Sequence, residues 1–168
     1  MTTVFRVAVQ VKLTEELKQI TPANGFINDM SESVFRGRAV YGSNDPLPML
    51  SIIEDPRERQ TLDGPIGSSA SSNKWRLLIQ GFVKDDAENP TDPAYLLATD
   101  TYRRLVQIKV ANRHDVLGFG SKKPCVTDIT IGDPIVRPAD DFSDKAYCWI
   151  PVVLDIVEDN ENPYLPTP

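Results

Sequence analysis

The stretch AYCWIPVVLDIVE, residues 146–158, carries the strongest structural signal in the sequence. Its alternate residues form one unbroken apolar face, which is typical of a β-strand that packs on a hydrophobic core. The residues of this face are Ala146, Cys148, Ile150, Val152, Leu154 and Ile156. Pro151 lies inside the run and has no backbone N–H, so we expect this strand at a sheet edge or at a bulge.

Four further segments have the composition of strands. Residues 74–84 alternate well, with Trp75, Leu77, Ile79 and Val83 on one face, and their other face is half apolar, so we expect it to be partly covered. Shorter apolar or alternating runs predict strands at residues 34–41, 49–54 and 125–132.

The first apolar segment, residues 3–20, fits two structures. Read with a period of two, its first half has a strand face that includes Phe5, Val9 and Leu13. Read with a helical period, the same segment has two apolar stripes, and its second half, LTEELKQI, favours a helix. The pattern leaves the first half open, whereas Pro22 and Gly25 indicate where the element ends.

A second helix is predicted over residues 93–112, with Asp92 as its N-cap and Pro93 as its first residue. The expected core stripe consists of Tyr95, Ala98, Tyr102, Leu105 and Val106. Asp100 and Arg104 have the spacing of an ion pair on the opposite side. Leu96 and Leu97 lie off the stripe, and we expect them to face a partner.

Two polar segments complete the chain. Residues 55–73 contain two glycines and two prolines without periodicity, which predicts a long loop of the kind often used for contact. Residues 158–168 are acidic and proline-rich and are interpreted as an extended C-terminal arm. The order α-β-β-β-α-β-β predicts one α+β domain over residues 1–157, with a mostly antiparallel sheet of about five strands and two helices on one face.

Composition restricts the function classes. A formal net charge of -6 and a pI near 4.8 disfavour a protein that binds nucleic acid by neutralising phosphates. No apolar run is long enough to cross a membrane, and the N-terminus lacks a signal-peptide pattern, so we expect a cytoplasmic protein without membrane contact. Cys125 and Cys148 are expected to be free buried thiols, because two cysteines are too few for a disulfide framework.

An acidic cluster, GFVKDDAENPTDPAYLL at residues 81–97, raises the question of a metal or catalytic site. Asp85, Asp86, Glu88 and Asp92 lack the spacing of a calcium loop, whereas acids are common where a strand turns into a helix. His114 is the only histidine and has no recognisable nucleophile beside it. We therefore predict no catalytic, cofactor-binding or metal-binding residue, and no cofactor.

The order of these motifs resembles the tail terminator (tail completion) proteins of long-tailed bacteriophages. The motifs are ITPANGF closing the first helix, then VFRGR, PLPMLSI, a long polar loop, KWRLLIQGFV, DPAYLLATDTYRRL, VTDITIG and the final apolar strand before an acidic end. The resemblance covers nearly the whole chain, and it favours a helix for residues 3–20.

The resemblance implies a structural protein and not an enzyme. Such a subunit forms a homohexameric ring on the head-proximal end of the tail tube, ends tube polymerisation and joins the tail to the head connector. Its expected partners are itself, the tail tube protein and the connector. It would be assembled in the host cytoplasm and reside in the virion. DNA would pass through the ring without specific binding, and an acidic lumen would suit this passage.

Three contact regions follow as hypotheses from expected exposure. They are the long loop with Arg57 and Arg59, the helix flank with Leu96, Leu97, Arg103 and Arg104, and the arm with Tyr164 and Leu165. One alternative is a head-side completion or neck protein from the same region of the virion. A small-ligand or metal-binding enzyme that uses Asp85, Asp86, Glu88 and His114 is the other.

Overall fold

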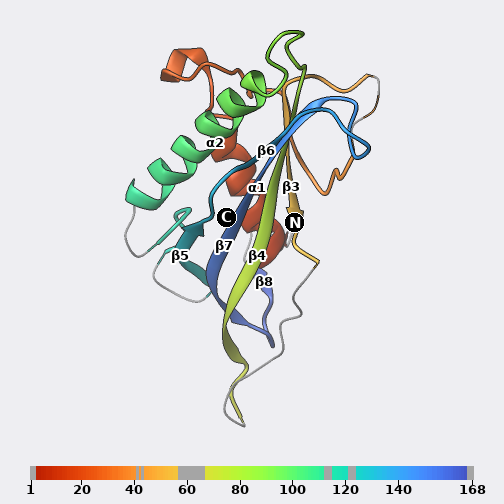
Figure 1. The fold of residues 1–168 in the computed structure, drawn as a ribbon. Coiled ribbons are helices and arrows are strands. Elements are labelled where there is room, and N and C mark those ends of the chain that lie inside the picture. Colours follow the sequence, from red (N-terminus) through yellow and green to blue (C-terminus); the bar gives the residue numbers. More distant parts are fainter. Residues whose placement is uncertain are drawn as a thin grey trace.

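The structure is a computed structural model that describes residues 3–40, 42, 44–56, 67–111, 115–120 and 124–165. It is an α+β fold in which two helices cover one face of a mostly antiparallel sheet, as the sequence predicts (Figure 1). The elements in chain order are β1 (Thr3–Val4), α1 (Phe5–Leu17), a 3-10 turn (Pro22–Asn24), β2 (Val34–Arg36), β3 (Met49–Glu54), β4 (Ala70–Val83), α2 (Asp92–Ala111), β5 (Cys125–Ile131), β6 (Ile135–Arg137), β7 (Ala146–Asp159) and β8 (Tyr164–Leu165).

The main sheet has the strand order β2-β3-β4-β7-β5, and β6 also pairs with β7. The β2/β3 pair is parallel and the other pairs are antiparallel. The centre of the sheet is the β4/β7 ladder, which runs from Ala70 opposite Asp159 to Val83 opposite Ala146. Because β4 begins at Ala70, the predicted loop over residues 55–73 is wrong at its end. The prediction also missed β6 and made β2 too long.

Pro151 does not lie on an edge strand, so the edge alternative of the prediction for this residue is wrong. β7 is an interior strand, but its neighbour on one side is interrupted, since β5 ends opposite Val152 and β6 begins opposite Trp149. The Pro151 carbonyl accepts a 2.8 Å hydrogen bond from Gly132 in this gap. The missing N–H therefore falls where β7 has no strand partner, and the ladder loses nothing.

The main core lies between the helices and one face of the sheet. α1 contributes Phe5, Val9, Leu13 and Leu17 at helical spacing, and β7 contributes every second residue from Ala146 to Ile156. This confirms the helical alternative for the first segment, apart from the two residues of β1. α2 packs closely on the sheet at Gly81, where an added Cβ would lie 2.8 Å from Cys148 Sγ and 2.9 Å from Leu97 Cδ2.

A smaller cluster occupies one end of the other, helix-free face of the sheet. Met49, Phe82 and Tyr147 are buried there, with Phe35, Leu47 and Trp149 packed against them. The expectation that this face is partly covered is thus confirmed for one end.

The C-terminal residues are tied to the start of α1. Val4, at the N-cap position, makes no side-chain capping bond, and the Phe5 N–H instead donates to the carbonyl of Pro163 at 3.0 Å. β8 pairs with β1, with Leu165 opposite Thr3. Residues 158 and 159, expected in the arm, belong to β7.

A half-buried ion pair reinforces the same corner. The Arg6 guanidinium donates to both carboxylate oxygens of Glu158 at 2.8 and 2.9 Å and lies 5.1 Å from the centre of the Trp75 ring. The hydrogen bond to Glu158 is the main reason that the pKa of Arg6 is raised above its ordinary value. The pair joins α1 to the end of β7 and places the Arg6 side chain beside Trp75 of β4.

The second helix also differs from its prediction in detail. It begins at Asp92, and the carbonyl of Thr91 accepts the first helical hydrogen bond, so Thr91 occupies the N-cap position. Asp100 is buried and does not pair with Arg104. Its Oδ2 accepts hydrogen bonds from the backbone N–H groups of Ile27 and Asn28 at 3.0 and 2.8 Å, which fixes the loop after α1 on α2.

Both cysteines are buried thiols outside any disulfide, as predicted. They are not neighbours, because Cys125 on β5 lies opposite Val157 whereas Cys148 lies opposite Gly81. Burial raises the pKa of the Cys148 thiol to about 12.

Candidate interaction surfaces

The solvent side of α2 carries more large apolar side chains than a surface helix needs. Tyr95, Leu96, Val106 and Val110 are 59%, 44%, 36% and 71% exposed. The opposite side of the helix packs on the core through Ala94, Leu97, Ala98, Thr101, Leu105 and Ile108. A helix that is apolar on both sides is typical of one that is covered on both sides, so the solvent side is a candidate contact surface.

Arg103 lies at the middle of this surface. Its guanidinium donates to the carbonyl of Gly25 at 2.8 Å and lies 4.8 Å from the centre of the Phe26 ring. No carboxylate of the described residues forms an ion pair with it. We call Tyr95, Leu96, Arg103, Val106 and Val110 the α2 outer face.

The C-terminal half of the α2 outer face is hollowed. An open, mostly apolar depression of about 590 Å³ is lined by Tyr102, Arg103, Val106, Gln107, Val110 and Ala111. A side chain from another molecule could enter it, since it opens broadly to solvent.

A second exposed apolar group lies on the helix-free face of the sheet. Phe142 is 55% exposed and packs against Tyr147 and Trp149, with ring centres 5.3 and 5.5 Å away. Ile135, 48% exposed, is the β-ladder partner of Trp149 and therefore projects from the same face. We call Ile135, Phe142 and Trp149 the aromatic patch.

Asp140 holds the loop that presents Phe142. Its carboxylate accepts hydrogen bonds from the Tyr147 hydroxyl at 2.8 Å and from the Phe142 N–H at 2.9 Å. The pKa of Asp140 is lowered from its ordinary value, first by the hydrogen bond from the Tyr147 hydroxyl and second by the bond from the Phe142 N–H. The neighbouring Asp141 is exposed and forms no ion pair with any cation that the structure describes, so the aromatic patch has an acidic rim.

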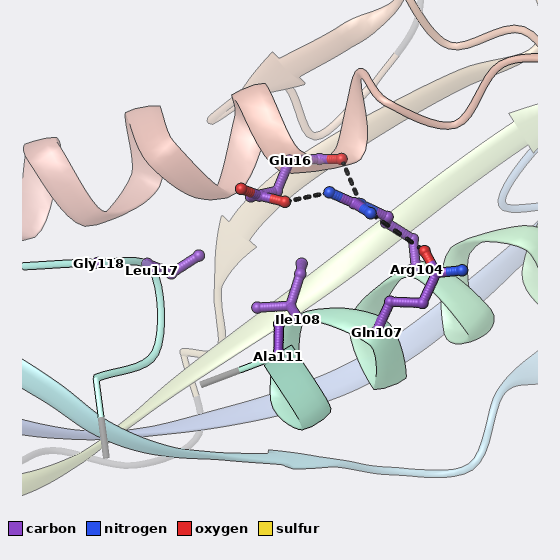
Figure 2. A pocket seen from close by; sticks show the side chains of 7 residues that line it. All are labelled: Glu16, Arg104, Gln107, Ile108, Ala111, Leu117 and Gly118. Atoms are coloured by element: carbon purple, nitrogen blue, oxygen red, sulfur yellow. Dashed lines mark hydrogen bonds and ion pairs between the residues drawn. The ribbon is translucent and has the colours of Figure 1, made fainter. Parts of the chain in front are cut away.

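A pocket lies between the two helices. It has a volume of about 240 Å³ and is lined by Glu16, Arg104, Gln107, Ile108, Ala111, Leu117 and Gly118. Figure 2 shows the Arg104 guanidinium directed at Glu16 of α1, while the apolar side chains of Ile108 and Ala111 lie farther along α2.

The Arg104 guanidinium forms hydrogen bonds with groups of its own chain and not with the interior of the pocket. It donates to the Glu16 carbonyl at 3.0 Å, to the Glu16 carboxylate, and to Gln107 Oε1 at 3.1 Å (Figure 2). The arrangement ties α1 to α2, and we assign it a structural role.

The predicted contact residues have different placements. Leu97 is fully buried in the core, so its prediction as a contact residue is wrong, whereas Leu96 and Arg103 are exposed on the α2 outer face. Arg104 is engaged within the chain. Tyr164 is exposed while its backbone pairs with β1, as does that of Leu165. Arg57 and Arg59 lie outside the described residues, as does His114.

The acidic stretch forms a turn. Asp86 accepts hydrogen bonds from the backbone N–H groups of Asn89 and Glu88, both at 2.8 Å, and these bonds lower its pKa. Within the described part of the chain, no group of three or more His, Cys, Asp or Glu side chains is placed to hold a metal ion.

The sequence reasoning missed the aromatic patch and the apolar character of Val106 and Val110 on the solvent side. A signal was present in PADDFSD, residues 138–144, where one large aromatic residue stands among acids in a loop. A large aromatic residue in an otherwise acidic loop indicates a surface that contacts another molecule.

No protein-family model matches this chain, and no curated protein is significantly similar to it. Among the described residues, no helix is long and apolar enough to cross a membrane.

Proposed function

We propose that this protein is a structural subunit of a long-tailed phage. Copies of the chain form a homohexameric ring on the head-proximal end of the tail tube, end tube polymerisation and join the tail to the head connector. The proposal combines the order of sequence motifs with the surfaces described above. It needs no cofactor and no chemistry at a reactive group.

The observation that carries the proposal is the α2 outer face. Four large apolar side chains along one side of a 20-residue helix are costly to leave in water, and a second protein surface would remove them from it. The aromatic patch on the helix-free face of the sheet gives the molecule a second contact surface. A subunit with two separate contact surfaces can bind two neighbours at once, which a ring requires.

The net charge of -6 suits the passage of DNA. If acidic residues line the lumen, phosphates are repelled from the wall and DNA slides without specific binding. Salt-sensitive, tight DNA binding by the purified protein would contradict this part of the proposal.

The oligomer is tested first with purified protein. We expect light scattering to give a mass several times 18.7 kDa at tens of micromolar protein, and negative-stain images to show rings. Val110→Asp should lower the mass to that of the monomer, because it places a charge on the α2 outer face. Val40→Asp is the matched control, since Val40 is 73% exposed but lies in the loop before β3. A monomer in every condition, or equal effects of the two variants, would count against the ring.

The role in the virion is tested in a phage that lacks this protein. We expect tail tubes of uncontrolled length and heads without tails, because nothing would end tube growth or join tube to connector. Labelled protein on complete particles should lie at the junction between tube and connector. A label on the head side in tail-less particles would instead identify a head-side completion or neck protein.

A further inference from the structure

The two exposed apolar surfaces lie on opposite sides of the sheet. The α2 outer face belongs to the layer of helices, whereas Phe142 packs on Tyr147 and Trp149 of the helix-free face. Figure 1 shows α2 on the left of the sheet, and the blue loop between β6 and β7 on the right. The two surfaces of one chain therefore cannot meet each other, and each needs another molecule.

The charges of the two surfaces are complementary. α2 contains two aspartates, two arginines and one lysine, a formal charge of +1, and one aspartate, Asp100, is buried beneath it. Residues 133–145 contain four aspartates, one arginine and one lysine, a formal charge of -2. Arg103 on the α2 outer face and Asp141 beside Phe142 form no ion pair with another described residue, as is also the case for Asp92 and Asp133 at the margins of the two segments.

We propose that the aromatic patch of one copy docks on the α2 outer face of the next, with Phe142 in the depression beside Val106 and Asp141 near Arg103. The contact is heterologous, because it joins different surfaces of the two copies, and repetition of such a contact gives a ring or a filament. The proposal rests on the proposed function in that copies of the chain associate.

The competing arrangement is a two-fold pairing of α2 with α2. Arg103 lies near the middle of the helix, so a two-fold axis through the α2 outer face would bring two positively charged guanidinium groups close together without a carboxylate between them. Like charges at an interface cost free energy, whereas the heterologous contact places the guanidinium beside a carboxylate. The charges therefore favour the heterologous contact.

The size of the surface indicates a weak pairwise contact. A 20-residue helix is about 30 Å long and about 10 Å across, so one side offers about 300 Å². Stable protein interfaces bury about 800 Å² on each partner. Residues beside the helix, such as the exposed Ile27, must contribute, and closure of a ring must add to the stability of each contact.

Cross-linking tests the contact directly. Val106→Cys and Phe142→Cys are made singly and together and treated with a short bis-maleimide at neutral pH, where the two native thiols are buried. We expect a ladder of multimers from the double variant, dimers from a mixture of the two single variants, and only monomers from each single variant alone. Dimers from Val106→Cys alone would establish the two-fold pairing and overturn the proposal.

Charge reversal provides an independent measurement. Arg103→Glu should weaken association about tenfold, and Asp141→Lys should restore most of it in the double variant. Glu88→Lys is the matched control, because Glu88 is an exposed acid in another loop and should not restore association. Equal effects of Asp141→Lys and Glu88→Lys would overturn the proposed pairing.

The outcomes separate this proposal from the function. Multimers in light scattering without cross-linking between positions 106 and 142 would overturn the heterologous contact and leave the ring proposal standing. A protein that remains monomeric throughout would contradict both.

Discussion

Gly81 offers the sharpest test of how closely helix and sheet are packed. In Gly81→Ala, the new Cβ would lie 2.8 Å from Cys148 Sγ, 2.9 Å from Leu97 Cδ2 and 3.1 Å from Leu50 Cδ2, and all three side chains are buried. Non-bonded carbon atoms are most stable about 3.5–4.0 Å apart, so each neighbour must move by about half an ångström or more.

The expected cost follows from overpacking. Extra atoms in a packed core cost about 1–3 kcal/mol, and three simultaneous close contacts place Gly81→Ala in the upper half of that range. Replacing a strand glycine returns roughly 0.5–1 kcal/mol through the unfolded state. We therefore expect a net loss of about 1–2 kcal/mol in the free energy of unfolding, or about 2–8 °C in Tm for a chain of this size.

Urea denaturation followed by circular dichroism measures this loss, and a double-mutant cycle identifies its cause. Cys148→Ala removes the sulfur atom that lies closest, so Gly81→Ala should cost at least about 0.5 kcal/mol less in that background. Gly42→Ala is the control, because its Cβ would meet only Asp45 Oδ2 at 3.7 Å, and it should change stability by less than about 0.5 kcal/mol. Additive effects, or a Gly81→Ala protein as stable as the parent, would refute the close approach.

Asp100→Ala should destabilise the fold by about 1–2 kcal/mol in the same assay, because it leaves the part-buried backbone N–H groups of Ile27 and Asn28 without this acceptor. Maleimide should label neither thiol of the native protein at pH 8, because both are buried and burial raises the pKa of Cys148 to about 12, and it should label both in denaturant. Rapid labelling of Cys148 in the native protein would contradict its burial. The hydrogen bond from Tyr147 lowers the pKa of the Asp140 carboxyl, so this group contributes stability that is present above its unfolded pKa and is lost as pH falls through its folded pKa. The urea concentration at the unfolding midpoint should therefore decrease when the pH is lowered below about 4, and it should decrease less steeply in Asp140→Asn. Deleting residues 161–168 removes the acceptor for the Phe5 N–H and the β1/β8 pairing, so Tm should fall by several degrees; an unchanged Tm would contradict that bond.

The sheet was largely predictable because its strands alternate clearly. β4 and β7 follow a period of two, and their long ladder is consistent with that pattern. β6 has no such pattern, because it has only three residues between Pro134 and Pro138 and forms as a partner of β7. The first segment needed more than its own pattern, since the same apolar positions satisfy a strand and a helix.

The orientation of α2 shows why contact residues are harder to predict than elements. Apolar residues occur all around this helix, so periodicity identifies a helix without saying which side faces the core. The pattern predicts Leu97 off the core stripe, but it is buried. It predicts Tyr95 and Val106 on the core stripe, but they are 59% and 36% exposed. The ion pair predicted for Asp100 failed for a related reason, because its real partners are backbone groups more than 70 positions away.

The antiparallel pairing of β1 with β8 brings the two ends of the described chain together. Thr3 and Leu165 are ladder partners, and such residues have Cα atoms about 5 Å apart. A linker of a few residues could therefore join them, and new ends could be opened in the exposed turn at residues 87–90. Such a circular permutant should keep the same core while moving its fusion point to this turn, so a reporter protein could be attached at either place.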